Sequence, residues 1–169
     1  MGNKTGAEIQ IEPIREEHIE SFHRCLDAVA RERKYLAFLE APPLESTAAF
    51  IRENIARDIP QFVALHGNEV IGFCDIRPKA LEGFKHTGTL GMGVLKNYRR
   101  QGIGERLIVE TIAKAKGQGL DRIELEVFAS NLPAIQLYEK LGFEVEGLKK
   151  NARKLDGVTD DLVVMALLY

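Results

Sequence analysis

The stretch Gly91-Met-Gly-Val-Leu-Lys-Asn-Tyr-Arg-Arg-Gln-Gly-Ile-Gly104 decides how this chain folds. Its first residues belong to an expected strand over Thr87–Leu95, and Gly102 begins an amphipathic helix that ends near Gly117. Amides in the first turn of a helix have no partner within the helix, and they lie at the positive end of its dipole. A glycine-rich turn that leads into a helix therefore predicts a site for a phosphate-like anion.

The residues of this turn favour a pyrophosphate, but not one held by the common nucleotide motifs. Arg99 and Arg100 add charge-assisted hydrogen-bond donors. A P-loop requires Gly-Lys-Ser or Gly-Lys-Thr, which the sequence lacks. A dinucleotide-binding turn requires a third glycine where this chain has Leu107, and a parallel rather than an antiparallel strand before it. The structural alternative is a tight strand–helix turn with solvated arginines.

Outward from this turn, strands and helices mix without strict alternation. Strands are expected over Ile9–Ile14, Gln61–His66, Glu69–Arg77, Thr87–Leu95, Arg122–Phe128, Phe143–Lys150 and Asp160–Leu168. Helices are expected over Glu16–Arg33, from a cap at Ser46 or Thr47 to Arg57, over Gly102–Gly117 and from Asn131 to Leu141. This order predicts an α/β (α+β) fold in one domain over residues 1–169, with a mixed, mostly antiparallel seven-stranded sheet and helices on both faces.

Composition argues against several functional classes. Charged residues make up 28% of the chain and its net charge is -2, so we expect no bulk electrostatic binding of nucleic acid or of an anionic membrane. The start MGNKTG has no apolar segment of a secretory signal, and it has Gly6 where a myristoylation signal has Ser or Thr. No apolar run reaches the length of a membrane span. We therefore expect a cytoplasmic protein.

The cysteines and histidines do not have the spacing of metal ligands. Cys25 and Cys74 lie outside any CxxC pair and are expected to be buried thiols in a reducing compartment. His18 and His23 are five residues apart and lack the HExxH spacing, so we expect them to be exposed or half-buried. No metal site is expected.

Two motifs resemble the signatures of the GCN5-related N-acetyltransferase superfamily. Arg99-Arg-Gln-Gly-Ile-Gly104 resembles its (Q/R)xxGx(G/A) acyl-CoA motif, and Leu125–Phe143 resembles its second signature. The resemblance extends over Phe62–Tyr169, and the first 60 residues match only in their β-α-α order. It implies the acyl-CoA N-acyltransferase fold and acetyl-CoA as the donor. Within the superfamily, the chain is similar to bacterial amino-acid and ribosomal-protein-alanine acetyltransferases.

The resemblance also implies which residues bind the donor. Where the strand over Thr87–Leu95 parts from its neighbour, the backbone from Met92 to Val94 is expected to pair with pantetheine and polarise the thioester carbonyl. Asn131 is a good helix cap by itself, and the resemblance adds a contact with pantetheine. The full set of expected donor-binding residues is Met92, Gly93, Val94, Arg99, Arg100, Gln101, Gly102, Ile103, Gly104, Glu105 and Asn131.

Two residues are candidates for catalysis by direct transfer in a ternary complex. The resemblance makes Tyr138 the general acid, because a phenol with a pKa of about 10 can protonate a thiolate whose conjugate acid has a pKa of about 8.5. The alternative is a tyrosine packed in the core with a bonded hydroxyl. Glu124 and Glu126 share one face of a strand, and Glu126 matches the general base of the ribosomal-protein enzymes. The alternatives are polar residues on a wet face, or deprotonation through water.

The acceptor site is expected to include the segment Arg31–Pro43. Glu32 and Glu40 are expected to attract an ammonium, with Tyr35 and Phe38 as the walls of a small pocket. The alternative is a solvated helix end whose aromatic rings pack on the core.

We therefore expect an N-acetyltransferase that acts on a primary amine of a small molecule such as an amino acid, a polyamine or an antibiotic. One alternative is a protein or peptide N-terminal acetyltransferase, which needs an open groove between Arg31–Pro43 and a turn at Asp156–Gly157. A second is a non-catalytic acyl-CoA-binding sensor, although Tyr138, Glu126 and the intact glycine turn argue against it. A homodimer is expected from the habit of the family alone.

Overall fold

The computed structural model describes residues 7–169, so the expectations for the start MGNKTG lie outside the described residues. The prediction of one domain over residues 1–169 stays a prediction. The strands are β1 (Ile9–Pro13), β2 (Gln61–His66), β3 (Glu69–Pro78), β4 (Thr87–Val94), β5 (Arg122–Phe128), β6 (Glu144–Leu155) and β7 (Val158–Leu168). The α-helices are α1 (Ile19–Arg31), α2 (Leu44–Ala56), α3 (Ile103–Gly117) and α4 (Leu132–Lys140).

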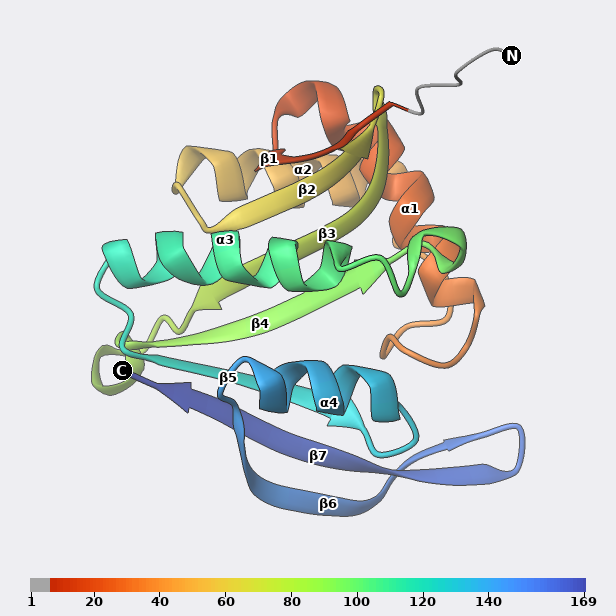
Figure 1. Ribbon diagram of the computed structural model, residues 1–169, viewed down its shortest axis with the longest axis vertical. Helices are drawn as coiled ribbons and strands as arrows, with labels where there is room; N and C mark the ends of the chain where they lie inside the picture. The colour runs from red at the N-terminus through yellow and green to blue at the C-terminus, as the bar shows by residue number, and fades with distance from the viewer. Residues whose placement is uncertain (1–6) are drawn as a thin grey trace, which may run out of the picture.

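Across residues 7–169 these strands form one seven-stranded sheet in the order β1-β2-β3-β4-β5-β7-β6 (Figure 1). Neighbours are antiparallel except β4 and β5, which are parallel, so the expected mixed and mostly antiparallel sheet is confirmed. The β4–β5 pairing covers only Thr87–Thr89 against Arg122–Glu124. Beyond that point the two strands diverge, as Figure 1 shows.

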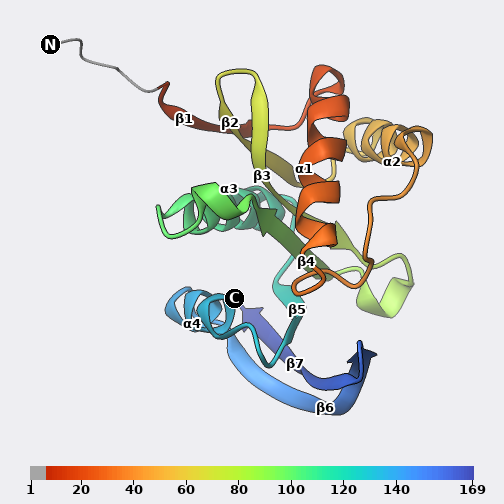
Figure 2. The ribbon, with the colours of Figure 1, turned by 90° about the vertical axis from the view of Figure 1, so that its right-hand side faces the viewer.

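The helices cover both faces of the sheet, as expected. Helices α1 and α2 lie on one face, and α3 and α4 lie on the other (Figure 2). Side chains of β3 alternate between the two resulting cores: Phe73 packs with α1 and α2, whereas Cys74 and Ile76 pack with α3. Each face of the central strands is therefore buried under a helical layer.

The start of α2 and the ends of β6 and β7 differ from the expectation. Helix α2 begins at Leu44 with Pro43 in the cap position, and the Thr47 amide donates to the Pro43 carbonyl at 3.1 Å. The predicted cap at Ser46 or Thr47 is therefore wrong, because proline already sets a backbone φ suited to a helix start. Strand β6 runs to Leu155 rather than Lys150, and β7 begins at Val158.

The tight turn between β6 and β7 explains this extension. Asp156 and Gly157 have φ of 51° and 76°, the left-handed conformation found in two-residue hairpin turns. Such a turn lets the strands pair up to its edge, from Leu155 opposite Val158. The sequence indicated the turn but not how close to it the pairing would extend.

Gly93 is required by the packing of β4 against the core under α1. A Cβ atom at this position would lie 2.7 Å from Cζ of Phe73, closer than real contacts allow. We expect Gly93→Ala to lower the free energy of unfolding by about 1–3 kcal/mol, because Phe73 must shift in a close-packed core. Urea denaturation followed by circular dichroism measures this. The matched control is Gly147→Ala, where a Cβ meets nothing within 4 Å; equal stability of the two variants would contradict the packing argument.

Candidate active site

The beginning of α3 has the backbone geometry of an anion site. Gly102 is the N-cap residue with φ of 76°, and Arg100 has φ of 62°. The first helical bond runs from the Arg106 amide to the Gly102 carbonyl at 3.1 Å, so the amides of Ile103, Gly104 and Glu105 have no partner inside the helix. Arg100, Gln101 and Gly102 are exposed. These amides are therefore available to a negatively charged ligand.

Gly104 brings this helix start close to β4. A Cβ atom on Gly104 would lie 3.2 Å from Cε of Met92 and 3.4 Å from Cδ2 of Leu137. The absence of a side chain therefore lets α3 lie directly on Met92. Glu105, the last of the expected loop residues, instead turns outward and pairs with Lys140 at 2.8 Å.

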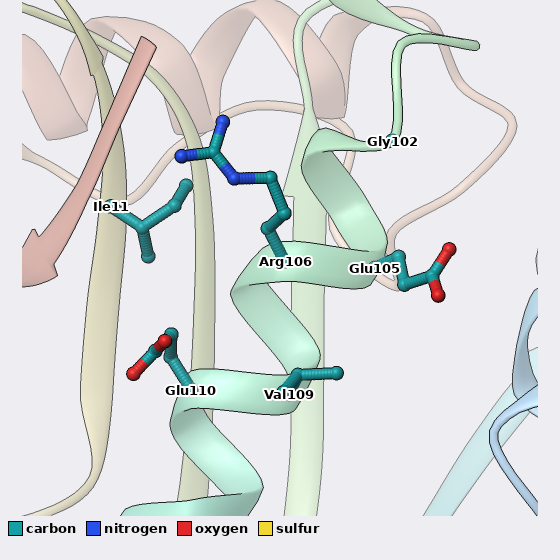
Figure 3. A pocket seen from close by; sticks show the side chains of 6 residues that line it. All are labelled: Ile11, Gly102, Glu105, Arg106, Val109 and Glu110. Carbon is teal, nitrogen blue, oxygen red and sulfur yellow. The ribbon is translucent and has the colours of Figure 1, made fainter.

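A pocket of about 510 Å³ adjoins the first turns of α3 on the side that faces β1 (Figure 3). Arg106 extends across it and donates to the Ile9 carbonyl at 3.1 Å. Glu105 and Glu110 also line this pocket. Two carboxylates disfavour a phosphate here, so the backbone amides of the α3 start are the better site for a diphosphate.

Arg99 is held by the loop between α1 and α2. Its guanidinium donates to both oxygens of Glu32 at 2.9 and 2.5 Å and to the Val94 carbonyl at 2.9 Å, and it stacks over Tyr35 at 4.5 Å. A direct contact between Arg99 and a diphosphate stays a prediction. The Glu32 carboxylate is thus paired with an arginine, and its attraction of an acceptor ammonium stays a prediction.

The other residues expected at the acceptor site stay predictions. Glu40, also expected to attract an ammonium, pairs with Arg31 at 3.3 Å. Phe38, expected to wall a small pocket, is 43% exposed. The bend of the loop allows these local ion pairs, and their geometry is not visible in the sequence.

The splayed edge of β4 offers free backbone groups beside the α3 start. Pairing with β5 ends at Thr89, whereas β4 continues to Val94 and pairs with β3 on its other side. The Leu95 amide donates to the Ile71 carbonyl of β3, so by alternation Gly93 also faces β3, whereas the backbone N–H and C=O groups of Met92 face β5 and need a partner. An extended ligand that contains amide groups can form these hydrogen bonds, as an additional strand would at the edge of a sheet.

Asn131 and Tyr138 lie at the two ends of α4. The Asn131 Oδ1 accepts from the Ala134 amide at 3.3 Å, which confirms the helix cap and leaves the Asn131 side-chain NH₂ group available. Tyr138 is 6% exposed, and its ring centroid lies 5.7 Å from that of Phe143. Burial raises the pKa of the Tyr138 phenol above its usual value, so it stays protonated and able to donate.

Glu124 and Glu126 face away from Tyr138. Leu125 packs in the core under α3 and α4, so the flanking glutamates of β5 lie on the opposite face, the side of α1 and α2. Glu126 is exposed and pairs with Lys149. Burial opposes ionisation of Glu124, but Lys79 and Arg122 outweigh it and hold the pKa of Glu124 below its usual value. The candidate acid and base thus approach the opening between β4 and β5 from opposite faces.

Asp75 of β3 is a further candidate site residue, which was not predicted from the sequence. It lies opposite Gly91 of β4, on the same face of the sheet as Glu126. Burial raises the pKa of Asp75 to about 6, and Arg77 counteracts part of that shift. The signal in the sequence was a single carboxylate within the otherwise apolar run Ile71–Ile76.

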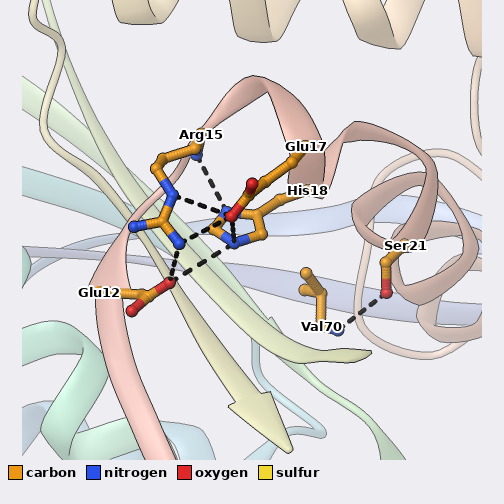
Figure 4. A network of polar contacts seen from close by, with 6 residues as sticks. All are labelled: Glu12, Arg15, Glu17, His18, Ser21 and Val70. Carbon is orange, nitrogen blue, oxygen red and sulfur yellow. Dashed lines mark hydrogen bonds and ion pairs between the residues drawn. The ribbon is translucent and has the colours of Figure 1, made fainter. Parts of the chain in front are cut away.

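The cysteines and His18 serve the fold. Cys25 and Cys74 are buried, as expected, and burial raises the pKa of the Cys25 thiol to about 12, which makes it a poor nucleophile. His18 is buried rather than exposed or half-buried (Figure 4). Its Nδ1 accepts from the Arg15 amide at 3.0 Å, and its Nε2 lies 3.5 Å from the Glu12 carboxylate. The ring is thus used to close the first helical turn.

Residues 7–169 include neither a cluster of potential metal ligands nor a helix suited to span a membrane. Among residues 7–169, no group of three or more His, Cys, Asp and Glu side chains is placed to hold a metal ion. Within the same residues, no helix combines the length and the apolarity needed to cross a membrane.

Several known proteins are similar to this chain in sequence or in architecture. The L-amino acid N-acetyltransferase AaaT of Escherichia coli K12 is 34% identical over 109 residues, which cover 64% of this chain and 67% of that protein. The ribosomal protein bS18-alanine N-acetyltransferase of the same organism is 38% identical over 71 residues, which cover 42% of this chain and 48% of that protein, so the match spans about half of that relative. A phosphinothricin acetyltransferase of Sinorhizobium meliloti, solved with acetyl-CoA, superposes with a TM-score of 0.88 at 18% identity, covering 95% of this chain and 88% of the other.

The splayed strands and the anion site at the α3 start define an acyl-CoA-dependent acyltransferase. Residues 15–143 match the signature described as the Acetyltransferase (GNAT) family, and the chain belongs to that family. The expected superfamily and fold are confirmed, as is N-acetyl transfer with acetyl-CoA as the donor. The individual site residues stay predictions.

Arg100 tests the anion site directly. Arg100→Asn removes the charge beside the α3 start, and asparagine tolerates the left-handed backbone that Arg100 adopts. We expect CoA to bind roughly tenfold more weakly, because a charge-assisted hydrogen bond is lost. Isothermal titration calorimetry measures the affinity, with Lys85→Gln, exposed and in the segment before β4, as the control. An unchanged affinity of Arg100→Asn would exclude Arg100 from the site.

Proposed function

We propose that the protein acetylates a primary amine of a small molecule, by direct transfer within a ternary complex. The observation that carries this proposal is the opening between β4 and β5, which has the α3 amides beside it and carboxylates on its other face. The donor thioester fits the α3 and α4 side, and the acceptor fits the α1 and α2 side. Transfer across the sheet then needs no covalent intermediate on the protein.

An ion pair across the acceptor side supports a small acceptor. Arg33, in the loop after α1, donates to both oxygens of Asp156 in the β6–β7 turn, at 2.9 and 3.1 Å. Arg153 adds a contact of 3.4 Å to the Arg33 carbonyl. The two segments that must part to admit a peptide are thus joined. The similarity to AaaT, named for amino acids, is in agreement with this proposal.

The proposed chemistry assigns one role to each side of the sheet. Glu126 takes a proton from the acceptor ammonium, which has no free electron pair until it loses that proton. Backbone N–H groups near Met92 stabilise negative charge on the thioester oxygen as the amine nitrogen attacks the carbonyl carbon. Tyr138 then donates its proton to the sulfur as the C–S bond breaks, and the second proton lost by the nitrogen restores the phenol through solvent. The low reactivity of the buried Cys25 thiol is consistent with direct transfer.

A peptide acceptor is the second candidate, and the similarity to the ribosomal protein bS18-alanine N-acetyltransferase favours it. A non-catalytic acyl-CoA sensor is the third, and it predicts binding without turnover. A cytoplasmic location and a homodimer stay predictions.

Tyr138→Phe tests the proposed acid. Phenylalanine keeps the ring in its buried position beside Phe143 and removes only the proton donor. We expect kcat to fall by about 100-fold or more, because general acid catalysis contributes that much, while the affinity for CoA changes by less than about threefold. Release of free thiol measures kcat, and calorimetry measures affinity. An unchanged kcat would remove Tyr138 from the mechanism.

The choice of acceptor is tested by free-thiol release with pools of amino acids, polyamines, aminoglycosides and peptides. We expect release with the small amines. The variant Asp156→Asn breaks the ion pair with Arg33 and keeps a residue that tolerates the left-handed turn. Because an exposed pair is worth about 0.2–1 kcal/mol, kcat/KM for peptides is expected to rise by at most about fivefold relative to small amines. Release from wild type with peptides alone would contradict the proposal.

A further inference from the structure

Most carboxylates on the proposed acceptor side form ion pairs with cationic side chains of the protein, and one does not. Glu124 pairs with Lys79 and Arg122, Glu126 pairs with Lys149, and Glu32 pairs with Arg99. Among the described residues, no cation forms an ion pair with Asp75, and Arg77 acts on it only at longer range. A half-buried carboxylate without a cation is costly, so such a group is expected to have a ligand.

The position of Asp75 points to the ligand. Asp75 lies opposite Gly91 on β4, one residue before Met92, whose backbone we propose to lie at the thioester. A Cβ atom on Gly91 would lie 3.1 Å from Oδ1 of Asp75, so the carboxylate occupies the place that a side chain would take at this position. The carboxylate thus lies directly against the β4 backbone, one residue from Met92.

A pocket at this place has the size of a small ligand. It has a volume of about 430 Å³, and it is lined by Asp75, Arg77, Pro78, Lys79, Thr89, Leu90 and Gly91. Neither basic residue of the pocket forms an ion pair with Asp75: Lys79 pairs with Glu124, and Arg77 stacks over Phe50 at 4.7 Å and acts on Asp75 only at longer range. Asp75 is thus the carboxylate of this pocket that has no ion pair among the described residues.

We propose that Asp75 determines acceptor specificity by binding the ammonium group of a small primary amine in this pocket, beside the β4 edge. This inference rests on the proposed function and names the residue that holds the acceptor. The carboxylate selects a cationic amine, and the volume of the pocket leaves room for the chain that carries it. Glu126, on the same face, then takes the proton from the bound ammonium.

Asp75 binds a cation only when it is ionised. Burial raises its pKa to about 6, so the carboxylate is charged above pH 6 and amine binding is lost as the pH falls through that value. The charged groups facing Asp75 are Arg77 and Lys79 of β3, which line the same pocket. Glu124 of β5 contributes indirectly, because it pairs with Lys79. The residues paired with it on β2 and β4, Gln61 and Gly91, do not titrate.

The stability of Asp75→Asn against urea distinguishes the two roles of this residue. Loss of a structural carboxylate lowers stability, whereas loss of a ligand-binding carboxylate that is costly to bury raises it. A carboxyl whose pKa is raised on folding binds its proton more tightly in the folded protein, so the fold loses stability as the pH rises past its usual value of 3.8. Asp75→Asn removes this cost. We therefore expect the variant to unfold at a higher urea concentration than wild type at pH 8. A lower midpoint would mean that Asp75 supports the fold.

The decisive experiment is steady-state kinetics of Asp75→Asn with acetyl-CoA and with L-alanine and spermidine as acceptors. We expect KM for the amine to rise at least tenfold, KM for acetyl-CoA to stay within twofold, and Asp75→Glu to recover part of the loss. Asp121→Asn, which removes an exposed carboxylate at the start of β5, is the control and should behave as wild type. An unchanged amine KM in Asp75→Asn overturns the proposal.

Calorimetry of spermidine and L-alanine with the CoA-saturated protein separates this proposal from the proposed function. Binding that is lost in Asp75→Asn supports the role of Asp75 even if no thiol is released from acetyl-CoA, in which case the proposed function alone fails. Binding that is equal in wild type and variant, or no binding of either amine to wild type, overturns the role of Asp75.

Discussion

Beyond Thr89, β4 has no neighbouring strand on the side of β5, and its backbone N–H and C=O groups there need partners from a ligand or from water. This opening exists because the parallel pairing with β5 covers only three residues. It lies beside the start of α3, where further amides are unpaired. The free edge of β4 thus offers hydrogen bonds to an extended ligand such as pantetheine. The start of α3 beside it offers amides to the anionic group of the same ligand.

The two helical layers give the opening two different sides. On the side of α3 and α4, Tyr138 lies in an apolar core that keeps its phenol protonated. On the side of α1 and α2, carboxylates and arginines form ion pairs that fix the loops, such as Glu32 with Arg99. Arg99 also binds the Val94 carbonyl, so it connects the acceptor loop to the end of β4. The proposed donor and acceptor sides are thereby separated by one layer of strands.

Much of the fold could be predicted from the sequence, because periodicity and turn residues are local signals. The cap at Asn131, the start of α3 at Gly102 and the turn at Asp156–Gly157 all depend on residues within one turn of the chain. Asp75 and the partners of Glu32 depend on which side chains meet across 16 to 67 residues of sequence, and a single sequence does not carry that information. Local signals could therefore predict the helix start and the helix cap of the candidate donor site, whereas the contacts on the candidate acceptor side could not be predicted.

The central claim is that CoA binds along the free edge of β4 with its diphosphate at the start of α3. Titration of ¹⁵N-labelled protein with CoA, followed by amide chemical shifts, measures this residue by residue. The account predicts the largest shifts at Met92 to Val94 and at Gly102 to Glu105. It would be contradicted if these amides did not move and the shifts gathered instead around Arg106 and Glu110, in the pocket between α3 and β1.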